Sequence, residues 1–212
     1  MLLRSSPCRC RPRRHHLRGF TLIELMVVVV IVGVLAVIAV PSMVERLRER
    51  RSSEAAQRIA ALYRGARMRA MGRGAAILVR YTEGSFTVLE SVQGTAGGVP
   101  SGCESLPQSS CMNGNWETIT QRRQVTAFNP LRNHPQQSEG SGLTIEAKDV
   151  SGSAAAELDV CYTPLGRSYT RGVPSEALGP MNGVISFDVT RGTGNLTRTV
   201  TVLPNGVARL AL

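Results

Sequence analysis

The stretch Arg18–Met43, RGFTLIELMVVVVIVGVLAVIAVPSM, decides the architecture of this chain, because it joins a basic segment to a long apolar run. A helix over residues 20–44 would be roughly 37 Å long at about 1.5 Å per residue. That length exceeds the approximately 30 Å hydrocarbon core of a bilayer. Six arginines precede the run and none lies within it. The length and composition predict a membrane-spanning helix over residues 20–43. The positive-inside rule predicts that its N-terminus lies in the cytoplasm.

One carboxylate, Glu24, lies within this apolar run. A carboxylate costs about 2.5–3.5 kcal/mol near the middle of a membrane helix and less near its end. Glu24 therefore either lies at the membrane interface at little cost or pairs with a cation supplied nearby. The small residues that follow the run contain Pro41, which makes them a poor site for ordinary signal-peptide cleavage.

Composition separates the chain into segments of different charge. The 212 residues carry a net charge of +10: residues 1–19 hold +6, residues 20–43 hold −1, residues 44–73 hold +6 and residues 74–212 hold −1. The C-terminal bulk is therefore close to neutral despite the basic total. The three histidines lie in the N-terminal segment or in a polar loop, and no metal-ligand spacing, phosphate-binding loop or nucleophile motif is present. We expect no enzymatic activity, no cofactor and no metal site.

Residues 44–73 continue the helical pattern as an amphipathic segment. Its apolar stripe consists of Val44, Ala55, Ala56, Ile59, Leu62, Tyr63, Ala66 and Ala70, and the glycines Gly72 and Gly74 predict its end. The other faces carry a row of arginines, for which three interpretations are open. The row is a solvated helix face, or it pairs with acids of neighbouring subunits and with lipid headgroups, or it binds nucleic-acid phosphates.

From residue 75 the apolar period changes from 3.6 to 2, which indicates strands. The predicted strands are residues 75–81, 85–91, 116–128 with a break, 142–148, 157–163, 183–190, 198–203 and 207–212. Because they follow one another with short turns and no helices between them, we expect an antiparallel sheet. The predicted fold class is therefore α+β, with a long N-terminal helix packed on an antiparallel β-sheet head over residues 74–212.

The N-terminal stretch resembles the signature of type IV prepilins: a basic leader ending in glycine, then Phe-Thr-Leu-Ile-Glu and an apolar helix. The resemblance implies a pilin-like fold and a cleaved leader over residues 1–19. A prepilin peptidase would cut after Gly19 and methylate the new N-terminus of Phe20. Glu24 would then guide subunit packing by pairing with that ammonium on its own chain or a neighbour's, and Pro41 would soften the helix.

The C-terminal quarter resembles the GspH/FimT family of minor pseudopilins and pilins, in a strand, a Pro/Gly-Arg turn around Gly166 and a final hairpin around Gly206. DNA-binding members of that family carry closely spaced glycines and arginines in the last turn, whereas this turn has one arginine. The candidate contacts to DNA or a partner are Arg167, Arg171, Arg198 and Arg209. The near-neutral head argues against a strong interaction with nucleic acid.

Together these resemblances imply a minor pseudopilin of a type II secretion system, a structural subunit of the periplasmic fibre that drives protein export. The alternative is a FimT-type minor pilin that primes type IV pilus assembly or binds DNA for uptake. The implied partners are the prepilin peptidase, other pseudopilins or pilins, and the assembly platform of the bacterial inner membrane. The head would lie in the periplasm.

The head contains three cysteines, at positions 103, 111 and 161. An oxidising compartment permits disulfides. Cys103 and Cys111 bracket a short loop and are the predicted pair, while Cys161 alternates into an apolar strand and is predicted to be a small core residue. The alternative is that all three are unpaired thiols.

Overall fold

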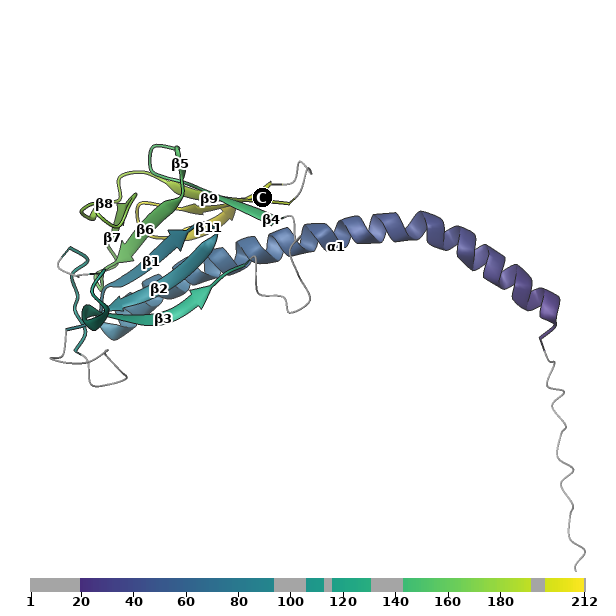
Figure 1. The fold of residues 1–212 in the computed structure, drawn as a ribbon, viewed down its shortest axis with the longest axis horizontal. Helices are drawn as coiled ribbons and strands as arrows, with labels where there is room; N and C mark the ends of the chain where they lie inside the picture. The colour runs from purple at the N-terminus through teal and green to yellow at the C-terminus, as the bar shows by residue number, and fades with distance from the viewer. Residues whose placement is uncertain (1–19, 94–105, 113–115, 131–142, 192–196, 212) are drawn as a thin grey trace, which may run out of the picture. The chain divides into compact units, whose positions relative to one another are not determined.

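The computed structural model describes residues 20–93, 106–112, 116–130, 143–191 and 197–211 (Figure 1). The structure divides at residues 45 and 46 into two compact units, which we describe separately. A single helix, α1 (Leu22–Arg73), contributes to both units. The remaining elements belong to the second unit.

The start of α1 is capped by its own sequence. The hydroxyl Oγ1 of Thr21 accepts a hydrogen bond from the backbone N–H of Glu24 at 3.3 Å, as an N-cap side chain does. At the other end, Gly74 adopts φ +67° and its N–H donates to the carbonyl of Ala70 at 3.1 Å. A glycine in this left-handed conformation is the common way to end a helix. The helix therefore ends at Arg73, as the two glycines predicted.

In the first unit, residues 20–39 are all exposed to their surroundings. The span Leu22–Ala39 is long and apolar enough to cross a membrane, as judged by length and composition. The helix assignment continues through Pro41, whose side chain lies outside the described residues.

The second unit contains two antiparallel sheets (Figure 1). The six-stranded sheet has the order β3-β2-β1-β6-β7-β8, and the five-stranded sheet has the order β11-β10-β9-β4-β5. The strands of the first are β1 (Ile77–Thr82), β2 (Ser85–Ser91), β3 (Arg122–Phe128), β6 (Glu157–Tyr162), β7 (Ser168–Arg171) and β8 (Gly179–Pro180). Those of the second are β4 (Leu143–Lys148), β5 (Ala154–Ala155), β9 (Ile185–Arg191), β10 (Thr197–Val202) and β11 (Ala208–Ala211). The predicted α+β architecture is confirmed.

All eight predicted strands are present, and the break predicted within residues 116–128 is the short 3₁₀ helix η1 (Ile119–Gln121). Three strands were missed: β5, β7 and β8. They contain two to four residues each, so they are too short to establish a period of 2.

One apolar core joins the amphipathic half of α1 to both sheets. Six residues of the predicted stripe are buried, Leu62 packs against the core while partly exposed, and the side chain of Val44 lies outside the described residues. At the centre, the ring of Phe187 on β9 lies 5.2 Å from Tyr63 and 5.5 Å from Phe86, measured between ring centroids. The few aromatic residues are thus concentrated where the helix and the two sheets meet, since they bury the most area per side chain.

A second, smaller apolar cluster covers the opposite face of the six-stranded sheet. Its members are Ala76, Leu78, Leu89, Cys111, Trp116, Cys161 and Leu178. In β1, Leu78 points to this cluster while its neighbours Ile77 and Val79 belong to the main core. This alternation across the pleat explains why β1 reads as a continuous apolar run rather than as a half-polar strand.

Two glycines provide a matched test of backbone and packing constraints in the head. Both Gly206 (φ +77°) and Gly152 (φ +84°) adopt the left-handed conformation, but a Cβ on Gly206 would lie 2.8 Å from Cε1 of Tyr162, whereas a Cβ on Gly152 would meet no atom within 4 Å. We expect Gly152→Ala to lower the free energy of unfolding by about 1–2 kcal/mol, the backbone cost alone. Gly206→Ala should cost about 1–3 kcal/mol more, because of the clash. Urea unfolding followed by circular dichroism measures both, and equal losses would contradict the packing assigned to Tyr162.

Candidate functional site

The N-terminal turn of α1 presents the residues singled out from the sequence. Phe20 is 82% exposed, and Glu24 lies in the first helical turn behind the Thr21 cap. Sequence reasoning missed the role of Thr21, although Thr-x-x-Glu is the spacing of a capping box. An acidic group in the first turn also interacts favourably with the helix dipole, by about 0.3–1 kcal/mol. The helix itself therefore stabilises the charge of Glu24, independently of any partner. Gly19 lies outside the described residues.

In the head, the first charged cluster is centred on Glu90 of β2, whose side chain is fully buried. Its carboxylate accepts hydrogen bonds from Arg123 of β3 at 2.7 Å, from Arg69 at 3.0 Å and from Arg73 at 3.2 Å. Burial alone would raise the pKa of Glu90, but the hydrogen bonds of Arg123 and Arg69 outweigh it and hold the pKa below its usual value. Arg69 and Arg73 of the predicted arginine row on the helix therefore pair with an acid of their own chain, which is not among the three interpretations drawn from the sequence.

The second charged cluster lies on the other face of the six-stranded sheet and is centred on Asp159 of β6. The Nε of Arg80 lies 2.9 Å from its Oδ1, and the Nε of Arg171 lies 2.8 Å from its Oδ2. Glu117 bridges the same two arginines at 2.6 Å and 3.0 Å. The pKa of Glu117 is lowered, chiefly by its hydrogen bonds from Arg80.

This cluster corrects one of the predicted contact residues. The side chain of Arg171 is only 8% exposed and is committed to Asp159, Glu117 and the carbonyl of Pro174. Arg171 is therefore part of the structure of the head and is not available to a partner. The sequence did not reveal this because the two acids lie 12 and 54 residues away from it.

The other predicted contact arginines are distributed over the head. Arg167 and Arg209 are exposed, and Arg198 on β10 is partly buried. The turn that contains Arg167 meets the turn of the last hairpin, since the Ser168 hydroxyl donates a hydrogen bond to the carbonyl of Pro204. The two turns that the sequence singled out are thus neighbours, and the helix residue Arg67, which sequence reasoning did not select, lies between them. A contact of these arginines with DNA or a partner stays a prediction.

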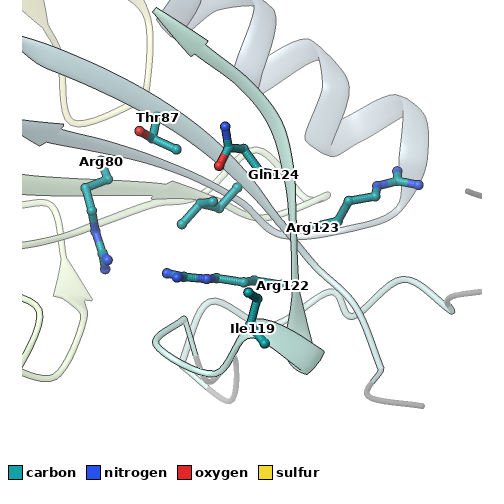
Figure 2. A pocket seen from close by; sticks show the side chains of 7 residues that line it. Arg80, Thr87, Ile119, Arg122, Arg123 and Gln124 are labelled. Carbon is teal, nitrogen blue, oxygen red and sulfur yellow. The ribbon is translucent and has the colours of Figure 1, made fainter. Parts of the chain in front are cut away.

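A cavity of about 560 Å³ opens on the six-stranded sheet beside η1 (Figure 2). Its lining residues are Arg80, Thr87, Leu89, Ile119, Arg122, Arg123 and Gln124. Figure 2 shows Arg122 and Arg123 leaving β3 in opposite directions, so the first reaches the carbonyl of Trp116 and the second reaches Glu90. Each arginine at this cavity therefore already has a partner, which leaves little free positive charge to attract a ligand.

The disulfide of the head differs from the predicted one. Cys111 is bonded to Cys161 of β6, 50 residues further along the chain, with 6.0 Å between the Cα atoms. The predicted Cys103–Cys111 pair is therefore wrong, because Cys111 is already used, and Cys103 lies outside the described residues. Cys111 is held against the sheet by Trp116, whose Nε1–H donates to its carbonyl at 3.0 Å. Cys161 is buried, as predicted, but it is also the disulfide partner.

Within the described ranges, no group of three or more His, Cys, Asp or Glu side chains is arranged to hold a metal ion. The charged clusters of the head contain arginine and carboxylate pairs that satisfy one another.

Comparison with known proteins identifies the N-terminal segment. Residues 14–40 match the family model described as the prokaryotic N-terminal methylation motif, which confirms the resemblance of this segment. No curated protein sequence matches the chain significantly. Two crystal structures of the type IV minor pilin FimU from Pseudomonas aeruginosa are similar, with 15% and 16% identity and TM-scores of 0.42 and 0.40. Each alignment covers 76% of this chain and 87% or 92% of FimU. Because both TM-scores are below 0.5, this likeness supports no inference about function.

The Glu90 cluster predicts a pH-dependent contribution to stability. With its pKa held below the usual 4.5, the folded carboxylate contributes stability above that pH and loses it as the pH falls through the lower folded value. We expect Glu90→Gln to cost about 2 kcal/mol at pH 7, allowing for solvent screening of Arg69 and Arg73, and the difference from the unmodified chain to shrink below about pH 4. The control is Glu54→Gln, which removes an exposed pair with Arg58 and should cost at most about 0.5 kcal/mol. Equal losses in urea unfolding at pH 7 would contradict the assigned role of Glu90.

Proposed function

We propose that this protein is a prepilin-type minor subunit of a bacterial envelope filament. The observation that carries the proposal is the methylation motif over residues 14–40, whose Phe20 lies two residues before the long helix and whose Glu24 lies in its first turn. In this proposal a prepilin peptidase removes residues 1–19 by cutting after Gly19 and methylates the amino group of Phe20. The apolar span Leu22–Ala39 then holds the subunit in the inner membrane until assembly.

The structure supports two roles for the same apolar helix. Residues 20–39 are exposed on all sides, so their surface needs either lipid or neighbouring helices. The leader is basic and the apolar run is free of arginine, which supports a cytoplasmic N-terminus and a periplasmic head. Transfer of the helix from the membrane into a bundle of like helices would lengthen the fibre by one subunit.

We place the subunit in a type II secretion system, as an H-type minor pseudopilin of the fibre that drives protein export. Support comes from the weak electrostatics of the head, where residues 74–212 carry −1 and Arg171 is neutralised by Asp159 and Glu117. A FimT-type minor pilin is the alternative, and DNA uptake by it would require several phosphate contacts along a continuous basic surface. Loss of export without loss of pili in a deletion strain would favour the first assignment, and the reverse result would favour the second.

Processing provides the first test. Gly19→Leu should block the peptidase, because a bulky side chain replaces the glycine before the cut, and the chain should keep its leader and an unmethylated internal Phe20. Intact-mass measurement of membrane fractions checks this. The control is Gly33→Ala, which lies in the exposed helix with no atom within 4 Å of the added Cβ and should be processed normally. A mature, methylated chain from Gly19→Leu would disprove the cleavage assignment.

A second test separates the two explanations of Glu24. If its charge pairs with the ammonium of a neighbouring Phe20, Glu24→Gln should lower incorporation into fibres at least about tenfold, since one member of a buried pair is lost. Thr21→Val removes the helix cap while leaving the charge, and it should change incorporation much less. Immunoblots of sheared fibres and membranes measure both. If Thr21→Val is as harmful as Glu24→Gln, the capping role suffices and the intersubunit pair is not needed.

A further inference from the structure

A second cavity of about 400 Å³ lies where α1, β7 and the last hairpin turn meet. Its lining residues are Arg67, Gly166, Arg167, Ser168, Tyr169, Pro180, Met181, Pro204 and Asn205. Two of these residues are arginines and none is acidic. The cavity is thus positively charged, and its remaining wall includes the apolar residues Pro180, Met181 and Pro204.

Two glycines make room for the arginine at the base of this cavity. Gly166 (φ +79°) and Gly206 (φ +77°) lie in turns closed by their own N–H groups, which donate to the carbonyls of Thr163 and Leu203. A Cβ on Gly166 would lie 3.5 Å from Nη2 of Arg67, and one on Gly206 would lie 3.4 Å from its Cδ. The Arg67 side chain therefore runs between the two turns, which hold it close to the backbone.

The charge of Arg67 has no counterpart among the described residues. Its Nε is buried without a hydrogen-bond partner there, in contrast to Arg69 and Arg73, which share Glu90. The nearby phenol of Tyr162 supplies no negative charge, because burial raises its pKa well above the usual value and the charge of Arg67 only partly opposes this. A buried guanidinium N–H without an acceptor is costly, so the site favours a ligand that supplies one.

We propose that this cavity, defined by Arg67, Arg167 and the two glycine turns, is a binding site for a carboxylate of a protein partner. A carboxylate accepts two parallel hydrogen bonds from one guanidinium, and Arg167 at the rim adds a second positive charge. The apolar walls, which include Pro180, Met181 and Pro204, suit the hydrocarbon stem of an aspartate or glutamate side chain. The identity of the partner as a neighbouring filament subunit rests on the proposed function. The preference of the site for a carboxylate is independent of that function.

The geometry favours a protein carboxylate over a nucleic-acid backbone. Binding of DNA draws on many phosphate contacts along a continuous basic surface. Here the head carries −1, and the other cavity, on the six-stranded sheet, has arginines that are already paired. A small open site with two arginines suits one acidic side chain.

The test uses the full chain in detergent micelles, with arginine side chains labelled with ¹⁵N. N-acetyl-glutamate N-methylamide is titrated in, and its neutral glutamine analogue is the matched probe. We expect the acid to cause a saturable shift of the Arg67 Nε–H resonance. The amide lacks the charge and should bind at least about tenfold more weakly than the acid. Arg167→Ala, an exposed change that leaves folding intact, should weaken binding of the acid several-fold.

Two further variants locate the site. Arg67→Lys keeps the charge but loses the planar fork, and it should weaken binding of the acid about tenfold. Arg64→Ala removes an exposed arginine of the same helix that does not line the cavity, and it should leave binding unchanged. Equal affinity for acid and amide, or equal losses in Arg64→Ala and Arg67→Lys, would overturn the proposal. Tighter, steeply salt-dependent binding of a short single-stranded DNA at Arg67 would overturn it in favour of a phosphate site. The processing and incorporation tests involve other residues, so a failure of the proposed function can be distinguished from a failure of the carboxylate site.

Discussion

The buried carboxylate of Glu90 is the interaction on which the arrangement of the head depends. A fully buried charge is tolerated only with partners, and here they come from the last turns of α1 and from β3. Because Arg69, Arg73 and Arg123 must all reach one carboxylate, the end of the helix, β2 and β3 are held in one relative position. Apolar packing of the alanine-rich stripe supplies most of the burial, but such a surface alone permits sliding of helix on sheet. The ion cluster therefore adds specificity to a contact whose energy is mainly hydrophobic.

The head has modest electrostatic strength because the positive charge of the chain lies in residues 1–19 and 44–73, while residues 74–212 carry −1. Within the head, several arginines are also paired, with Glu90 on one side of the six-stranded sheet and with Asp159 and Glu117 on the other. The disulfide between Cys111 and Cys161 fastens the segment that covers the second of these faces. Arg67 differs from these arginines, because its buried Nε has no hydrogen-bond partner among the described residues.

The two halves of the helix illustrate how one secondary structure serves two environments. Before Ala39 the side chains are apolar on every face, so the surface has no preferred side and suits lipid or a bundle of similar helices. Beyond Arg50 a single stripe is buried and the other faces are charged, so the helix has one partner, its own sheets. The transition from one pattern to the other takes place within a helix that contains Pro41. Filament assembly, as proposed here, needs both properties in one subunit.

The sequence by itself determined the elements whose signals are local. The periodicities of 3.6 and 2 gave the long helix, its end at Arg73 and eight of the described strands, and the residues around Gly19 gave the methylation motif. Tertiary structure alone decided which groups meet: Cys111 pairs with Cys161 rather than Cys103, Arg171 turns inward to Asp159, and Arg80 reaches the same acid from 79 residues away. The reason is physical, because a helix or strand depends on neighbours within a few residues, whereas a disulfide or buried ion pair depends on the path of the chain. Strands too short to show a period, such as β8, share that dependence.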